Sequence, residues 1–143
     1  MKLNPRVRAW WMLVPGQLLV LACVAAWLLL PNLVTRRDLE SILESGPVLS
    51  HQVKVRVHNE HDYGWVIEHH ASPAEDAEMV RGMSAQIRWV AGHTTLPAEP
   101  RVDTYIAWDH FWSPYTDSGH SFYHVISDSS GQVVGYIGPL PYK

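Results

Sequence analysis

A long uncharged apolar segment near the N-terminus constrains this 143-residue chain more than any other feature. It runs from Ala9 to Leu30 without an Asp, Glu, Lys or Arg. A helix of that length would extend about 33 Å, which is enough to cross the hydrocarbon core of a bilayer. Tryptophans stand near both ends, as is typical of segments that meet two membrane interfaces: Trp10, Trp11 and Trp27. The sequence therefore predicts a transmembrane anchor.

Two other interpretations of this segment stay open. A cleaved secretory signal would explain the basic residues before it, but the apolar run continues from Trp27 to Leu30, beyond the small residues at which a peptidase would cut. The residues from Val20 to Cys23 loosely resemble a bacterial lipobox, in which Cys23 would carry the lipid. The mature chain would then begin with a strongly apolar sequence. An uncleaved span is the favoured interpretation.

Basic residues on the two sides of the segment predict its orientation. The N-terminal side carries three of them besides the terminal amine, and the far side carries two: Lys2, Arg6 and Arg8 against Arg36 and Arg37. An excess of Lys and Arg marks the cytoplasmic side of a span. We therefore expect a single-pass signal-anchor protein with a cytoplasmic N-terminus and an extracytoplasmic C-terminal part, which is periplasmic if the organism is bacterial.

Four parts are expected along the chain. They are a cytoplasmic tail at 1–8, the transmembrane anchor at 9–34, a juxtamembrane amphipathic helix at 35–46 and a small extracytoplasmic domain at 47–143. About 100 residues are enough for one hydrophobic core and too few for two. The single cysteine, Cys23, lies in the apolar segment, so the outer domain has no thiol for a disulfide or a nucleophile.

The outer domain is acidic. From Gly46 onward the sequence has six Lys and Arg against eleven Asp and Glu, a balance of -5. Nucleic-acid binding depends on clustered positive charge that neutralises phosphates. The charge balance therefore argues against a nucleic acid as partner.

Local patterns predict two helices. Thr35 with Asp38 forms a capping-box pattern at the start of the 35–46 helix. Ser72, Pro73 and Glu75 supply an N-cap, a proline at the first helical position and a second capping box. We expect this second helix to end at Gly92 and to bury one row of side chains: Ala77, Val80, Met83 or Ser84, Ile87 and Val90.

Alternating side chains predict five strands. The first two are His51 to His58 and Tyr63 to His69, joined by a turn at 59–62, in a register that places His51 opposite His69. The third is the run 102–112, and the last two form a hairpin, 121–128 and 132–137, around a turn that ends at Gly131. The predicted fold class is α+β: a single N-terminal transmembrane helix, then a small antiparallel sheet with one packed helix in the order ββαβββ.

The nine histidines are the one unusual feature of the composition. Imidazole binds zinc and copper and titrates near neutral pH. Two groups would converge in the predicted structure: His51 with His69 across the first hairpin, and His58, His61 and Asp62 in its turn. Neither matches the four-ligand spacing of a structural zinc site. Scattered surface histidines, a zinc or copper site and a pH-sensing cluster all remain as interpretations.

The sequence contains no nucleophile elbow, phosphate-binding glycine loop or helical His-Glu-x-x-His motif, so we assign no catalytic residue. Several polar residues near position 115 leave a small membrane-anchored hydrolase as a third hypothesis: Asp109, His110, Asp117, Ser118, His120 and Ser121. The same region is rich in aromatic residues, which suit a protein interface: Trp108, Phe111, Trp112 and Tyr115.

The leading hypothesis is a membrane-anchored, non-catalytic accessory or assembly subunit of a membrane or envelope complex. Its expected partners are the lipid bilayer and either a membrane protein or a second copy of the chain. The alternative is a domain that binds or delivers zinc or copper through its histidines.

Overall fold

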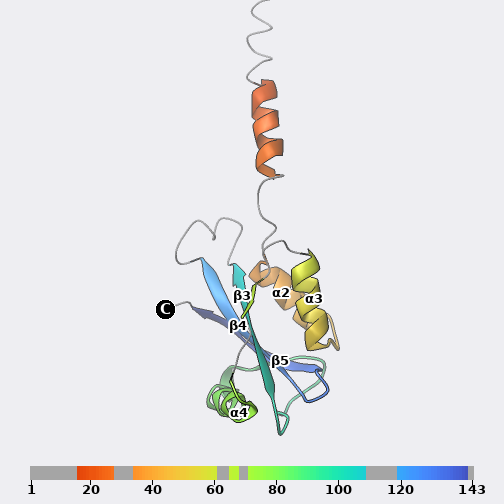
Figure 1. The fold of residues 1–143 in the computed structure, drawn as a ribbon, viewed down its shortest axis with the longest axis vertical. Coiled ribbons are helices and arrows are strands. Elements are labelled where there is room, and N and C mark those ends of the chain that lie inside the picture. Colours follow the sequence, from red (N-terminus) through yellow and green to blue (C-terminus); the bar gives the residue numbers. More distant parts are fainter. Residues whose placement is uncertain (1–15, 28–33, 61–64, 68–70, 109–118, 142–143) are drawn as a thin grey trace, which may run out of the picture. The chain divides into compact units, whose positions relative to one another are not determined.

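The structure is a computed structural model that describes residues 16–27, 34–60, 65–67, 71–108 and 119–141. The chain divides into two compact units, Met1–Pro31 and Asn32–Lys143. In the first unit, residues 16–27 are helical and exposed (Figure 1). Within the described ranges, no helix combines the length and the apolar character that a membrane crossing needs.

The second unit is built around a five-stranded antiparallel sheet with the strand order β1-β3-β4-β5-β2. The strands are β1 Trp65–Ile67, β2 Arg88–Trp89, β3 Arg101–Trp108, β4 His120–Ser127 and β5 Val133–Pro141. The helices are α2 Arg36–Glu44, α3 Ser50–Glu60, α4 Pro73–Gly82 and the short 3-10 turn η1 Ser84–Gln86. The α+β class is confirmed. The predicted order ββαβββ is wrong, because its first strand is helix α3 and the short strand β2 follows α4.

Helices cover both faces of the sheet, whereas the sequence predicts one helix on one face. Figure 1 shows α2 and α3 on one side of the strands and α4 on the other. The larger core cluster joins α2 and α3 to one face of the sheet and includes Leu39, Leu43, Val53, Val57, Tyr105, Tyr123 and Tyr136. A smaller cluster joins α4 to the opposite face and includes Val80, Ile87, Val102, Ile126, Val134 and Ile137. The central strands are therefore apolar on both faces.

The predicted first hairpin is wrong. The segment expected as its first strand lies in helix α3, and β1 pairs with β3 instead, with Trp65 opposite Ile106. Alternation every two residues also places Val53 and Val57 four apart, on one side of a helix. Both are buried at 0% and 1% exposure, whereas Val55 is 52% exposed. Burial under tertiary contacts has overridden the strand preference of valine.

Helix α4 begins as predicted and ends early. Ser72 caps it with both hydrogen bonds of a capping box. The helix stops at Gly82, and Arg88–Trp89 forms strand β2 against β5. The predicted burial of Ile87 and Val90 is confirmed, but strand geometry provides it. Glycine weakens a helix, and the edge of β5 offers a ladder of backbone hydrogen bonds in its place.

The C-terminal hairpin is confirmed. Strands β4 and β5 pair around a turn in which Gly131 has a φ of 85°, the left-handed conformation that glycine adopts without strain. The Asp128 carboxylate accepts hydrogen bonds from the hydroxyl and N–H of Ser130 and from the N–H of Gln132. The Ser130 hydroxyl is the main cause of a lowered pKa of Asp128. The turn is closed by contacts within its own few residues.

Candidate functional site

Val34, the first described residue of the second unit, is buried in the larger core cluster. This side chain is 1% exposed, and its carbonyl accepts the N–H of Trp108 at 2.9 Å. Thr35 forms a parallel bridge with Trp108 and caps α2 with both hydrogen bonds of the predicted capping box. The chain is thus fixed to the end of β3 at its first described residues.

Aromatic side chains gather at this end of the sheet. Trp108 lies opposite His120 in the ladder, with ring centroids 5.4 Å apart at 68°, and the rings of His120 and Phe122 are 6.0 Å apart at 79°. Edge-to-face packing of this kind is favourable between aromatic rings. All three side chains are half-buried. We call Val34, Thr35, Trp108, His120 and Phe122 the aromatic end.

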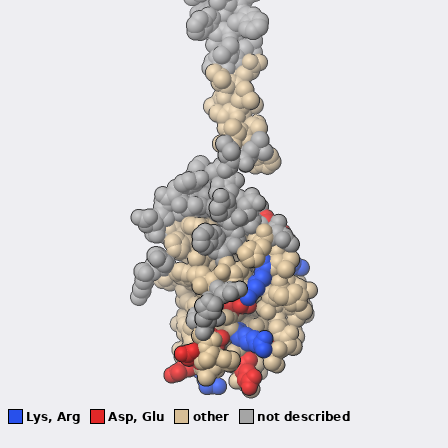
Figure 2. All heavy atoms as spheres, in the orientation of Figure 1, with Lys and Arg blue, Asp and Glu red and all other residues tan. Residues whose placement is uncertain are grey.

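The two basic residues at the start of α2 directly follow the aromatic end. Arg37 is exposed, and the Nε–H of Arg36 donates to the Tyr123 hydroxyl at 3.3 Å. Figure 2 shows acidic side chains over the part of the unit that carries α4. On α4, Glu75 and Glu78 are exposed, whereas Asp76 is buried.

A second polar group, which we call the tyrosine network, fastens α2 to the sheet. The Tyr123 hydroxyl donates to Glu40 at 2.9 Å, and the Tyr136 hydroxyl donates to Glu44 at 2.7 Å. One guanidinium nitrogen of Arg88 lies 3.4 Å from the Tyr136 hydroxyl and 3.5 Å from Glu40. The sequence did not single out these five residues, because they meet only when α2, β2, β4 and β5 are packed together.

The electrostatics of this network favour a structural role. Burial raises the pKa of Tyr123 to about 12 and that of Tyr136 to about 12. The hydrogen bond with Tyr136 is the main cause of a raised pKa of Arg88. Both tyrosines are therefore protonated at neutral pH and act as hydrogen-bond donors to carboxylates. A general base would need a pKa nearer the working pH.

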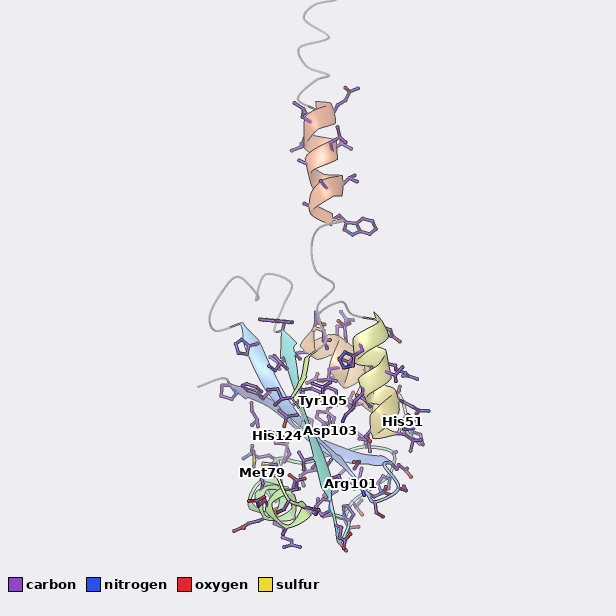
Figure 3. All side chains as sticks on the ribbon, viewed as in Figure 1. His51, Met79, Arg101, Asp103, Tyr105 and His124 are labelled. Carbon is purple, nitrogen blue, oxygen red and sulfur yellow. The ribbon has the colours of Figure 1, made fainter. Side chains whose placement is uncertain are left out.

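The hairpin that would place His51 opposite His69 does not form, because His51 lies in helix α3. His51 and His58 lie seven residues apart on helix α3, both exposed, whereas two helical histidines that share an ion stand four apart. Figure 3 shows His51 on α3, away from His124 on β4. The other three predicted ligands, His61, Asp62 and His69, lie outside the described residues. Among the residues that are described, no three His, Cys, Asp or Glu side chains form a group that could hold a metal.

One predicted interface residue, Trp108, belongs to the aromatic end. The other three, Phe111, Trp112 and Tyr115, lie outside the described residues, as do Asp109, His110, Asp117 and Ser118. His120 and Ser121 stand on β4, where the Ser121 side chain is buried. His124 Nδ1 lies 2.9 Å from the Thr104 hydroxyl on the neighbouring strand.

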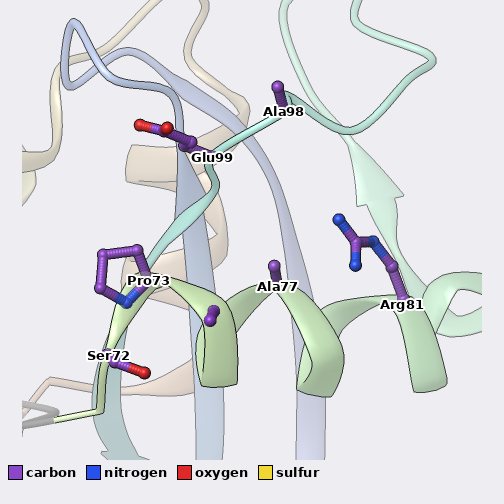
Figure 4. A pocket seen from close by; sticks show the side chains of 7 residues that line it. Ser72, Pro73, Ala77, Arg81, Ala98 and Glu99 are labelled. Atoms are coloured by element: carbon purple, nitrogen blue, oxygen red, sulfur yellow. The ribbon is translucent and has the colours of Figure 1, made fainter.

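The surface formed by the described residues of the second unit includes two open hollows. One, of about 510 Å³, runs along α4 and is lined by Ser72, Pro73, Ala74, Ala77, Arg81, Ala98 and Glu99 (Figure 4). The other, of about 410 Å³, lies on α2 and is lined by Arg37, Glu40, Ser41, Glu44 and Ser45. The first has a floor of small side chains, and the second borders the tyrosine network.

Comparison of this chain with protein families, curated proteins and solved structures finds no match.

Proposed function

We propose that the protein is a single-pass membrane protein whose C-terminal unit acts by contact, as an accessory or assembly subunit of a membrane or envelope complex. The observation that carries this proposal is the short link between the apolar segment and the fixed start of the second unit. Four residue steps separate Leu30 from Val34, which is buried and bonded to Trp108. Such a stretch spans at most about 14 Å.

A link this short restricts what the second unit reaches. If the segment from Ala9 to Leu30 crosses the bilayer, the C-terminal unit stays at the membrane surface, without a long flexible tether. Its partners are then membrane proteins or proteins already bound at that surface. The tyrosine network supports the same conclusion, because it holds α2, the first helix after the link, rigidly on the sheet.

The chemistry of the described residues favours contact over catalysis. The hydroxyls of the tyrosine network donate to carboxylates of the same network, and their raised pKa values disfavour a role as bases. The aromatic end combines half-buried rings with a nearby exposed arginine, a composition that suits an interface.

Membrane anchoring is tested by charge substitution in the apolar segment. The full chain is expected to stay in the membrane pellet after alkaline carbonate extraction, with an intact mass of 16.2 kDa. Replacing Leu19 and Leu21 together by Arg costs about 6 kcal/mol of insertion free energy, so this variant should become extractable. A matched variant with Leu19→Val and Leu21→Val should stay in the pellet. A shorter mature mass, or a wild-type chain released by carbonate, would refute the anchor.

The role as a subunit is tested by cross-linking in the source cells, followed by purification in mild detergent. We expect one membrane protein, or a second copy of the chain, to be captured at a constant ratio. The double-Arg variant should lose this capture, because it removes the unit from the membrane surface. A full-length protein that migrates alone and is captured with no partner would contradict the proposal.

A further inference from the structure

Two kinds of side chain that favour membrane surfaces occur at the same end of the sheet. Trp108 and Phe122 are half-buried and uncharged. The backbone of Val34 and Thr35 pairs with Trp108, and the exposed Arg37 follows two residues after Thr35. Tryptophan favours the boundary between headgroups and acyl chains, and arginine is attracted to anionic headgroups. A bilayer surface satisfies both preferences at once.

The end of the sheet that carries α4 is highly charged, with exposed Glu75 and Glu78 beside exposed Arg81 and Arg101. At the other end, the first acid of α2, Asp38, is occupied in the capping box, where it accepts from the N–H and hydroxyl of Thr35. The exposed acids of α4 lie at the other end of the sheet (Figure 2). That end is marked by Arg101, the first residue of β3 (Figure 3). It is about 23 Å from Trp108 at the rise of a strand.

We propose that the aromatic end, together with Arg37, lies in the headgroup region of a bilayer that contains anionic phospholipid. This inference rests on the proposed anchor, because the short link from Leu30 limits how far Val34 stands from the membrane. Trp108 and Phe122 contact the interface with their exposed ring surface. Arg37 adds attraction to the anionic headgroups. The end that carries α4 faces away from the lipid, which keeps its carboxylates in water.

The test measures lipid contact at the two ends of the β4–β5 hairpin. The full chain, with Cys23→Ser, receives a single cysteine and an environment-sensitive fluorophore at Pro141→Cys or at the control position Ser129→Cys. Pro141 is exposed at the end of β5, opposite Ser121 and next to the aromatic end, and Ser129 is exposed in the turn at the other end of the hairpin. The protein is reconstituted in vesicles of about three parts phosphatidylcholine to one part phosphatidylglycerol, with a quencher on the lipid headgroups.

We expect about threefold stronger quenching at Pro141→Cys than at Ser129→Cys, because only the aromatic end meets the headgroups. Arg37→Glu should weaken the quenching at the Pro141 label in the anionic vesicles and leave it unchanged in vesicles of phosphatidylcholine alone. Arg37→Gln is the matched neutral control, with a smaller effect in the same direction. Glutamate suits the first turn of a helix, so the reversed charge does not disrupt α2.

The outcomes separate this inference from the proposed anchor. Equal quenching at both ends of the hairpin, or stronger quenching at Ser129→Cys, would overturn the inference. If carbonate extraction leaves the chain in the membrane but neither end is quenched, the anchor stands and the inference fails, since a protein or water then covers the aromatic end. A chain that carbonate releases refutes both.

Discussion

The three fully buried tyrosines give a sharp test of how the domain is held together. Tyr105, Tyr123 and Tyr136 are all 0% exposed and lie in the same core cluster. The hydroxyls of Tyr123 and Tyr136 donate to Glu40 and Glu44. The hydroxyl of Tyr105 has no hydrogen-bond partner among the described residues. Replacement by phenylalanine removes one oxygen in each case, so the ring packing stays the same and the hydroxyl alone is tested.

The expected changes in the free energy of unfolding differ in sign or size. A hydrogen bond to a charged group stabilises a protein by about 1.5–3 kcal/mol. Because Glu44 is exposed and regains water when it loses its partner, we expect Tyr136→Phe to cost about 1–2 kcal/mol. Each variant also loses an arginine contact, with Arg36 for Tyr123→Phe and with Arg88 for Tyr136→Phe. Because Glu40 is less exposed than Glu44, Tyr123→Phe should cost about 2 kcal/mol. Tyr105→Phe relieves the burial of an unpaired hydroxyl and should be neutral or stabilise by up to about 1 kcal/mol.

Urea unfolding of the full chain in mild detergent, followed by near-ultraviolet circular dichroism, measures these differences. A change of about 1 kcal/mol also moves the melting temperature by roughly 4–8 °C in a domain of this size. The reasoning is refuted if Tyr105→Phe destabilises the domain as much as Tyr136→Phe does. If Tyr123→Phe and Tyr136→Phe unfold with the same free energy as the unmodified chain, the hydroxyls of the tyrosine network contribute nothing to stability.

Tyr123 and Tyr136 also predict how stability depends on pH. Their folded pKa values of about 12 lie above the ordinary value of 10, so the folded state holds these protons more tightly than the unfolded state. The stabilisation is complete below pH 10 and is lost as pH rises through about 12. Two pKa units correspond to at most about 2.7 kcal/mol for each tyrosine. The fall in the midpoint of urea unfolding between pH 9 and pH 12 should be smaller in Tyr136→Phe than in the unmodified chain.

Three further predictions concern the fold, each measured by urea unfolding of the full chain. Val53→Ala should cost about 2 kcal/mol and Val55→Ala under about 0.5 kcal/mol, because only the first valine is buried in helix α3; equal costs would favour a strand. Gly138→Ala should cost about 3 kcal/mol, since its Cβ would lie 2.7 Å from the Tyr123 ring and 2.9 Å from the Phe122 carbonyl, whereas Gly82→Ala meets open space and should be close to neutral. Ser72→Ala should cost about 1 kcal/mol by removing the cap of α4, and an unchanged midpoint would contradict that role.

The sequence predicts only part of the candidate site. Trp108 is predicted to be an interface residue, because several aromatic residues follow it closely in the sequence. Its contacts with Val34 and His120 join segments that are far apart in the sequence, so no local pattern predicts them. The glutamates of the tyrosine network are four residues apart on α2. Only the packed structure shows that tyrosine hydroxyls of the sheet donate hydrogen bonds to them.

Local sequence signals determine the helix caps and the turn, and tertiary contacts determine the remaining choices between helix and strand. The sequence by itself determined the caps at Thr35 and Ser72 and the turn at Gly131, because the hydrogen bonds or backbone conformations that define them lie within a few residues. Alternation from His51 to His58 left strand and helix both possible, since a period of two also contains a spacing of four. Only tertiary burial selected the helix, and only the free edge of β5 made Arg88–Trp89 a strand. Where partners lie far apart in sequence, the packed structure alone decides.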